Sequence, residues 1–431
     1  MKYLRSLLIF SFGISSLTGC SHKDEKIIRP EDYAVYLNRD NDKSWATCNE
    51  ELRFWRTKLS EVPESETYRA KVAGLLSSRF MLNGRIEDIH SSDSLYNLII
   101  ANTQQKYASL HRALAGNAIT QHQFRKAKKE IETALEIGEG KASSLFMLVD
   151  VNMELGDYAA ARMTMKEFRN KNFHPYIIRQ AKLEDHEGRL DSAIVMMETA
   201  LDKVKDNPTL TLWTRSNLAD MYGHAGRIEE AYANYLAVLK QNPDYYYALK
   251  GIAWIAFSHD HNYAEAKHIV HAIRLKRATP DMHLLLAEIA DCENDQPEKE
   301  KQLSLFVKEA ADPKYGDMYN KYLARVEAEE LSNAKRAIEI AHKEIENRPT
   351  PQSYDLLAWG HMQNGNMEEA LAIAQQHIEG KTYEPDAFYH LGVIYSANGN
   401  KGQARRYFEE AAQSAFELGP KIASQIEKQL N

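Results

Sequence analysis

Four histidines lie close together in the sequence, and their type and spacing could bind a metal: His259, His261, His268 and His271. The last two are three positions apart on a predicted helix, so their side chains can share one face. Neutral imidazoles in such an arrangement can ligate zinc. The same pattern also fits a polar connection between helices followed by a solvated helix face. We favour that second interpretation, and hence predict no metal site.

Motifs for catalysis or cofactor binding are absent from the sequence. It has no glycine-rich phosphate loop, no Gly-x-Ser-x-Gly turn, no His-Glu-x-x-His and no Cys-x-x-Cys. The three tyrosines from Tyr245 to Tyr247 could stack on a sugar or a base, but they directly precede a predicted helix and are expected to pack between helices. We therefore expect a protein that is not an enzyme and needs no cofactor.

The composition indicates a packed chain without a nucleic-acid-binding surface. Only 20 glycines and 12 prolines occur among 431 residues, which disfavours collagen-like, linker-rich and turn-dense all-β chains. Hydrophobic residues make up 44% and charged residues 27% of the chain, ordinary values for a folded protein. The formal net charge of -7 provides no broad cationic field, so nucleic acid is not expected as a partner.

The amino terminus is typical of an export signal. A cationic start with Lys2 and Arg5 precedes an apolar stretch that is too short to span a bilayer. Residues 17–20, Leu-Thr-Gly-Cys, resemble the lipobox of bacterial lipoproteins, in which the cysteine is acylated and becomes the first residue. The resemblance implies a signal peptide over 1–19, lipidation of Cys20, and an anchor in the outer membrane of a Gram-negative bacterium, facing the periplasm or the cell surface. The alternative is an ordinary secretory signal with an incidental cysteine.

A unit of about 35 residues repeats along most of the chain. Positions of one kind, which we call anchors, recur at intervals of 32 to 38 residues and are small with one exception. The anchors are Ala127, Ala161, Ala193, Ala231, Ala266, Lys299, Ala337, Ala370 and Ala404. Glycines at 156, 188, 226, 365 and 399 mark expected turns between helices. The clearest units, at residues 212–243 and from Phe388 onward, resemble tetratricopeptide repeats.

In that family small residues let two antiparallel helices approach closely, while large residues fill the facing holes. The resemblance implies an all-α fold, a right-handed α-solenoid of about ten helix-turn-helix repeats over residues 65–415. Each unit is expected to contact only its neighbours. The pattern departs from the family at Lys299, and at Ala253 and Trp254, where Leu and Gly would be expected. Looser packing is predicted at these places.

The segments that flank the repeat array are expected to be a linker and two caps. Residues 20–42 are predicted to form an exposed lipidated linker, and residues 43–64 an N-terminal cap helix. The first repeat is irregular, with a long connection predicted over residues 83–93. Residues 416–431 are predicted to form a short amphipathic helix that covers the last repeat.

By the same resemblance, the first helix of each repeat lines a concave groove. The groove positions carried over from the family include Phe146, Met153, Ile178, Trp213, Asp220, Trp359, Met362 and Tyr389. Asn217 is added as a hydrogen-bond donor to a ligand backbone. Apolar side chains surrounded by charged ones suit the binding of an extended peptide or a partner helix.

The leading hypothesis is a membrane-tethered interaction scaffold that binds a peptide or helical segment of another exported or outer-membrane protein. The second hypothesis is a glycan-binding lipoprotein of a nutrient-uptake system; in such proteins long insertions interrupt the repeats, whereas the spacing here never exceeds 38 residues. The third is a metal-dependent enzyme built on the four histidines. None of the three hypotheses identifies the partner.

Overall fold

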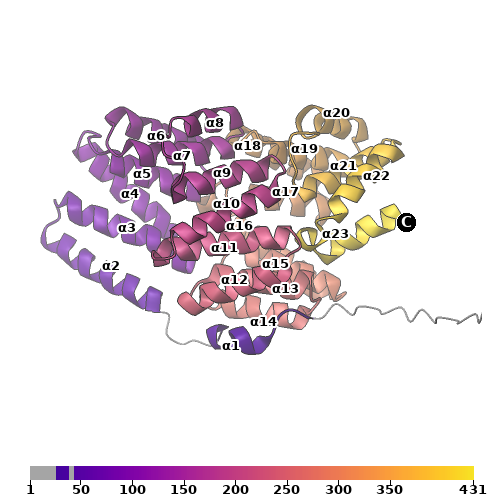
Figure 1. Ribbon diagram of the computed structural model, residues 1–431, viewed down its shortest axis with the longest axis horizontal. Coiled ribbons are helices and arrows are strands. Elements are labelled where there is room, and N and C mark those ends of the chain that lie inside the picture. The colour runs from indigo at the N-terminus through magenta and orange to yellow at the C-terminus, as the bar shows by residue number, and fades with distance from the viewer. Residues whose placement is uncertain (1–25, 38–42) are drawn as a thin grey trace, which may run out of the picture.

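The computed structural model describes residues 26–37 and 43–431, so the predicted signal peptide and Cys20 lie outside the described residues. The described part contains 23 α-helices, one short 3-10 helix and no strand. The expected all-α repeat solenoid is confirmed (Figure 1). In these two ranges no helix is both long enough and apolar enough to cross a membrane.

Ten pairs of helices follow one another, and the two helices of each pair pack against each other. The first five pairs are α3 (Glu66–Asn83) with α4 (Ile86–Asn102), α5 (Ala108–Thr120) with α6 (Phe124–Ile137), α7 (Lys141–Glu154) with α8 (Tyr158–Lys166), α9 (His174–His186) with α10 (Leu190–Lys203), and α11 (Pro208–His224) with α12 (Ile228–Gln241). The next five are α13 (Tyr246–Ser258) with α14 (Tyr263–Arg274), α15 (Asp281–Cys292) with α16 (Gln296–Ala310), α17 (Asn320–Glu329) with α18 (Ala334–Asn347), α19 (Pro351–Gln363) with α20 (Met367–His377), and α21 (Pro385–Ala397) with α22 (Lys401–Ala412). The 3-10 helix η1 (Pro313–Tyr315) precedes α17, and α2 (Lys43–Glu61) precedes the first pair, in the range predicted for a cap helix.

In many of the helix pairs, one residue in the turn and one small residue in the second helix recur at the same two positions. The glycines expected in turns, at positions 156, 188, 226, 365 and 399, all have φ between 71° and 81° between two helices. Glycine tolerates this left-handed conformation because it has no Cβ to clash. Five positions after each of these glycines stands an anchor alanine that is at most 4% exposed, and its small side chain lets the two helices approach closely.

Other residue types occupy the same turn position in other pairs. His122, His261, Asn294 and Ser332 have φ between 49° and 59°, and each also stands five positions before an anchor. A left-handed backbone is costly for such residues, so the packing of the two helices must outweigh the local strain.

The first pair differs from its prediction. No long connection spans residues 83–93, because α4 begins at Ile86 and continues through that range. Ile86 and Ile89 are buried together with Phe80 of α3, which keeps the start of the helix on the core. Gly84, with φ of 72°, turns the chain between the two helices.

Lys299 does not loosen its repeat in the way we predicted. Its ammonium lies 2.6 Å from a Glu330 carboxylate oxygen and 3.2 Å from Asp291. Lys421 contacts the same two carboxylates, at 3.0 Å and 2.8 Å. The charge that replaces a small residue is therefore paired within a four-residue network that joins α15, α16 and the end of α17 to the last helix.

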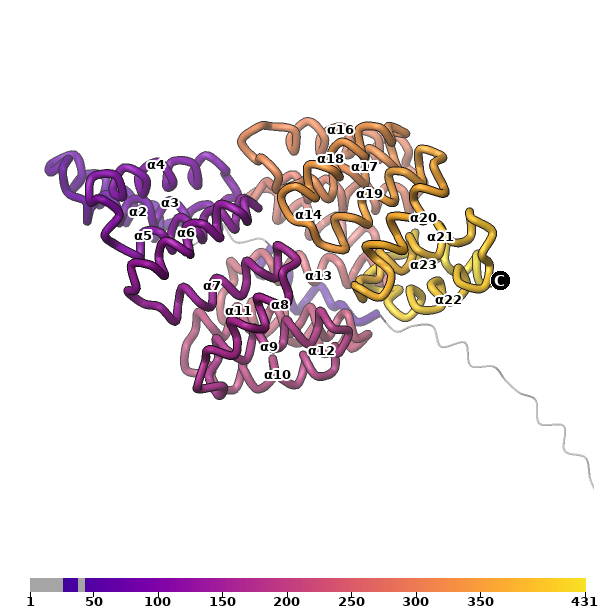
Figure 2. Tube along the Cα trace, turned by 90° about the horizontal axis from the view of Figure 1, so that it is seen from above, coloured from indigo at the N-terminus to yellow at the C-terminus, as the bar shows by residue number. Residues whose placement is uncertain are grey.

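Successive turns of the superhelix touch each other. Figure 2 shows α16 to α18 returning beside the ends of α4 and α6. Arg125 Nε donates to Glu346 O at 2.6 Å across 221 residues, and Lys314 Nζ donates to Glu87 Oε1 at 2.7 Å across 227 residues. The prediction that each unit contacts only its neighbours is wrong, because the rotations added by successive repeats bring the chain back against itself.

The short helix α1 (Pro30–Leu37) packs on second helices, α12 and α14. Tyr33 is fully buried, and its hydroxyl donates to Glu265 Oε1 at 2.8 Å. The Asp260 carboxylate accepts the backbone N–H groups of residues 27 and 28 at 3.1 and 3.0 Å. The described part of the predicted linker 20–42 is therefore a docked segment rather than an exposed one.

Candidate functional site

The last helix, α23 (Ala415–Leu430), lies on the inner face of the superhelix. It contacts α11, α13, α15 and α21, which are all first helices of their pairs. Our prediction that residues 416–431 cover the last repeat is incomplete. The helix does contact α22, but it kinks at Gly419, where φ is 80° and ψ is 167°, and it reaches helices more than a hundred residues earlier in the chain (Figure 1).

Hydrogen bonds fix both halves of α23. The Phe416 carbonyl oxygen accepts the Trp254 indole N–H at 3.1 Å and the Ser258 hydroxyl at 2.6 Å. In the second half, the Tyr389 hydroxyl donates to Gln425 Oε1 at 2.8 Å. The inner face thus already binds one helix of its own chain.

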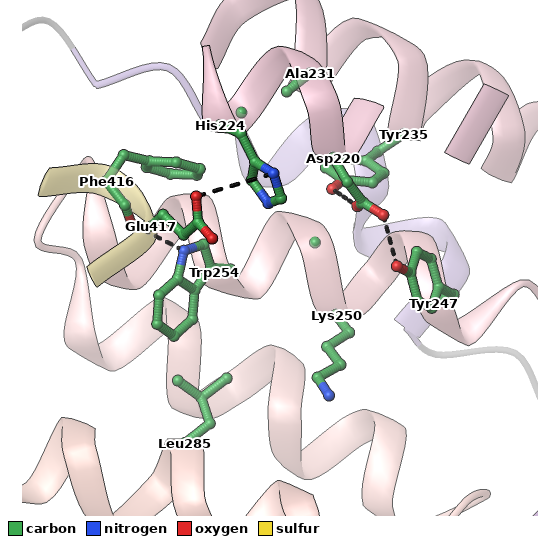
Figure 3. A pocket seen from close by; sticks show the side chains of 12 residues that line it. Asp220, His224, Ala231, Tyr235, Tyr247, Lys250, Trp254, Leu285, Phe416 and Glu417 are labelled. Atoms are coloured by element: carbon green, nitrogen blue, oxygen red, sulfur yellow. Dashed lines mark hydrogen bonds and ion pairs between the residues drawn. The ribbon is translucent and has the colours of Figure 1, made fainter. Parts of the chain in front are cut away.

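A cavity of about 350 Å³ opens where α23 enters the inner face (Figure 3). Its walls come from α11, α12, α13, α15 and α23. They consist of Asp220, Gly223, His224, Ala231, Tyr235, Tyr247, Lys250, Gly251, Trp254, Leu285, Phe416 and Glu417. Rings and charged groups therefore face the same space, a combination found in ligand-binding cavities.

Asp220 is held in this cavity by two phenols. The Tyr235 hydroxyl donates to Asp220 Oδ1, and the Tyr247 hydroxyl donates to Oδ2 at 2.5 Å (Figure 3). Burial raises the pKa of Asp220, and the two phenolic hydrogen bonds oppose this shift. In the described part of the chain no Lys, Arg or His forms an ion pair with this carboxylate, and His224 and Lys250 act on it only at longer range.

Glu417 brings a second carboxylate to the cavity. Its Oε2 lies 3.9 Å from His224 Nδ1, and burial raises the pKa of Glu417 although His224 opposes the shift. The one lysine of the wall, Lys250, lies 2.6 Å from Asp281 Oδ2 and extends away from Asp220 (Figure 3). The cavity therefore has more negative than positive charge available to a ligand.

Two glycines make room for the rings of the wall. A Cβ on Gly251 would lie 2.3 Å from the Tyr235 ring, and a Cβ on Gly223 would lie 2.9 Å from the Phe416 ring. Contacts this short require the ring to move. The bare backbone at these two positions therefore lets Tyr235 reach Asp220 and lets Phe416 close the cavity.

The predicted groove residues on α11 fall in and near the cavity. Asp220 lines it. Trp213 lies earlier on the same helix, outside the cavity wall, and is 43% exposed. The Asn217 amide donates to the Trp213 carbonyl at 2.7 Å, so that donor is already engaged within the helix.

The remaining predicted residues lie in three other places. Phe146 and Met153 are buried in one apolar cluster, and Ile178 is packed at the edge of the central core. Trp359 is 5% exposed and packs with Met362 and Tyr389. The structure thus divides the nine residues among four places rather than along one continuous surface.

Sequence reasoning missed most of the cavity wall. Tyr247 was expected to pack between helices, yet it is 51% exposed. One signal was present in the sequence, since Trp254 stands where the repeat pattern requires Gly, and its side chain instead meets α23. No signal could have identified Phe416 and Glu417, because their part in the wall depends on where the last helix docks.

The four histidines lie where the sequence predicted, in a turn and on a helix. His261 occupies the left-handed turn between α13 and α14, and His268 and His271 are exposed on α14. His259 Nδ1 lies 2.7 Å from Asp260 Oδ1. Among the residues that the structure describes, no three His, Cys, Asp or Glu side chains could hold a metal together.

Comparison with known proteins identifies the repeats. Two family models described as tetratricopeptide repeat match residues 385–417 and 212–233. No curated protein sequence matches the chain. Neither matched model indicates a catalytic family.

Several solved structures are similar at low identity. A tetratricopeptide repeat protein from Parabacteroides merdae is 16% identical over 60% of this chain and 98% of its own, with a TM-score of 0.34. Yeast Tom70 is 13% identical over 93% and 96%, with a TM-score of 0.33. The Cut9–Hcn1 hetero-tetramer of APC/C is 15% identical over 90% and 84%, with a TM-score of 0.41. From the matched repeats and the ten helix pairs, we conclude that this chain is an all-α solenoid containing tetratricopeptide repeats.

Proposed function

We propose that the protein is a membrane-tethered scaffold whose inner face binds a helical or extended segment of another exported protein. One observation carries the binding part of this proposal: the inner face already binds a helix, since α23 packs against α11, α13, α15 and α21. A surface that accommodates one helix through aromatic, amide and lysine contacts offers the chemistry that another segment would use.

The tether in this proposal is a lipid on Cys20, for which the sequence of residues 17–20 is the support. The position of α1 is compatible with it. Because α1 packs on second helices, the chain enters the fold on the outer face. A lipid anchor on that side would leave the inner face open to a partner at the outer membrane.

Site-specific photocrosslinking tests the binding surface. A photoreactive residue in place of Tyr247, which is exposed on the inner face, is expected to give a discrete crosslinked partner in cells. The matched control replaces Val195, which is 60% exposed on the second helix α10. The same products from both positions would contradict binding on the inner face.

Fractionation tests the tether. The substitution Cys20→Ala is expected to move the protein from the membrane fraction to the soluble exported fraction, because a single acylated residue supplies the anchor. Protease treatment of intact cells then tells whether the protein faces outward. Retention of the Cys20→Ala variant in the membrane would contradict the lipid anchor.

Glycan binding is kept as a second candidate function because aromatic rings line the cavity. The Trp254 and Tyr247 side chains both face it, and aromatic faces are common platforms for sugars. A neutral sugar would, however, leave the negative charge of Asp220 and Glu417 uncompensated.

A further inference from the structure

We propose that the cavity between α11, α13 and α23 binds the cationic head of a lysine or arginine side chain presented by the partner segment. The proposal deepens the scaffold function and rests on it for the source of the side chain. It is carried by the geometry of the cavity, in which two carboxylates and several aromatic rings line one open cavity (Figure 3).

The charges of the wall are unbalanced. Asp220 receives hydrogen bonds from Tyr235 and Tyr247 and from no basic side chain of the described residues. Glu417 has His224 as its basic neighbour, at 3.9 Å, beyond hydrogen-bond distance. Each of these carboxylates is partly removed from water by burial and would therefore gain from a cation placed beside it.

The basic groups of the wall do not fill that role. The Lys250 ammonium is 2.6 Å from Asp281, outside the cavity wall. His224 is 43% exposed at its side chain, and its one ion pair among the described residues is with Glu417. His224 and Lys250 lower the pKa of Asp220 without forming an ion pair with it, so the place of a directly contacting cation stays open.

The aromatic side chains suit a cation on an alkyl stem. Trp254, Tyr247 and Phe416 present rings to the same space, and ring faces attract ammonium and guanidinium groups while their carbons pack on methylenes. A volume of about 350 Å³ is at the low end for ligand pockets. It accommodates one long side chain rather than a folded element.

The position of α23 indicates how such a side chain would arrive. Phe416 and Glu417 form one wall at the point where α23 enters the inner face. A partner segment that lies beside α23 could insert one side chain without displacing the helix. This favours a basic residue on a protein segment over a free amine as the natural ligand.

The test uses n-butylammonium as a probe of the lysine head and stem, with n-butanol as its neutral counterpart, titrated against the full chain by calorimetry and ligand-observed NMR. We expect n-butylammonium to bind at least tenfold more tightly than n-butanol, and the difference to shrink with added salt. Equal affinities for the two probes would overturn the proposal without requiring any variant. If a peptide side chain is the natural ligand, acetyl-lysine-N-methylamide with a free side chain is expected to bind more tightly than n-butylammonium. Weaker binding would contradict a protein side chain as the natural ligand.

Variants locate the site. The double substitution Asp220→Asn and Glu417→Gln is expected to weaken n-butylammonium binding at least tenfold. The control Asp202→Asn removes a negative charge from a carboxylate on α10 whose side chain is 78% exposed. It should leave n-butylammonium binding unchanged. Unchanged binding in the double variant, or tighter binding of maltose than of n-butylammonium to the wild type, would overturn the proposal. Photocrosslinking at position 247 remains a separate test, so a failure of the cation site is distinguishable from a failure of the scaffold function.

Discussion

Two carboxylates on inner helices show how strongly the surroundings of a residue decide its ionisation. Asp386 lies 3.2 Å from Arg325 and 3.9 Å from Lys321; although burial raises its pKa, these cations lower it to about 2. Glu288 forms no ion pair among the described residues. Glu288 keeps an exposed surface, but the protein that surrounds it on the inner face displaces much of the nearby water and raises its pKa to about 7; the nearby Arg325 opposes the shift only in part.

The opposite shifts give opposite pH dependences. The pKa of Asp386 is lower in the folded than in the unfolded chain, so its stabilising effect is complete above pH ~4 and is lost as the pH falls toward ~2. Glu288 has the higher pKa in the folded chain, so the folded state holds a proton that the unfolded state has released. Stability therefore rises as the pH falls from ~8 to ~4.5.

The substitution Glu288→Gln tests this assignment. A neutral amide has no charge to desolvate, so the variant is expected to unfold at a higher temperature than the wild type at pH 8. Because water reaches this side chain, screening reduces the gain to about 1 kcal/mol. Most of the gain should disappear at pH 5, where the folded-state carboxyl is protonated. Thermal unfolding at both pH values measures it, with Glu132→Gln on the exposed face of α6 as control; the same gain at both pH values would refute the raised pKa.

At the scale of helices, most of the repeat array could be predicted from the sequence. The anchor alanines and the turn glycines are local signals, since a small buried residue and a left-handed backbone are properties of single positions. The start of α4 was missed because polar residues at 83–93 were interpreted as a connection, while the buried pair Ile86 and Ile89 holds that range in a helix.

The docking of α1 and α23 could not be predicted in the same way. Tyr33 and Trp254 form hydrogen bonds with residues 232 and 162 positions away in the sequence. A single sequence contains no signal for contacts at such separations. The candidate site shares this limit. Asp220 follows from its repeat position, but Tyr247, Phe416 and Glu417 join it only because α23 docks on the inner face.

Charge pairing should control the second half of α23. Lys421 contacts Asp291 at 2.8 Å and Glu330 at 3.0 Å, so Lys421→Glu would place three carboxylates together. We expect residues 420–430 to exchange amide hydrogens faster in this variant, because the helix would leave the inner face. Lys428→Glu makes the same change at an exposed position of the same helix. Equal exchange in the two variants would show that the network does not hold α23.

At the scale of the molecule, contacts between turns convert a linear array into a closed one. Arg348, which follows α18, lies 3.3 Å from Glu154 at the end of α7 and stacks over the Phe124 ring at 5.3 Å. A Cβ on Gly156 would lie 2.9 Å from Pro349 O. Early and late repeats therefore stabilise each other directly, whereas in an open solenoid each repeat is stabilised only by its neighbours.

The substitution Glu154→Arg should open this closure. Glu154 accepts a hydrogen bond from Lys182 Nζ at 2.9 Å and forms an ion pair with Arg348 at 3.3 Å. Although burial raises the pKa of Glu154, both cations lower it. An arginine there would bring three cations together and cost about 1–3 kcal/mol in lost pairing. We expect a larger radius of gyration by small-angle scattering and a thermal transition that separates into two steps. Glu132→Arg, on the exposed face of α6, makes the same charge change away from the contact. An unchanged radius and one transition in the Glu154→Arg variant would mean that repeats far apart in sequence are not coupled through this contact.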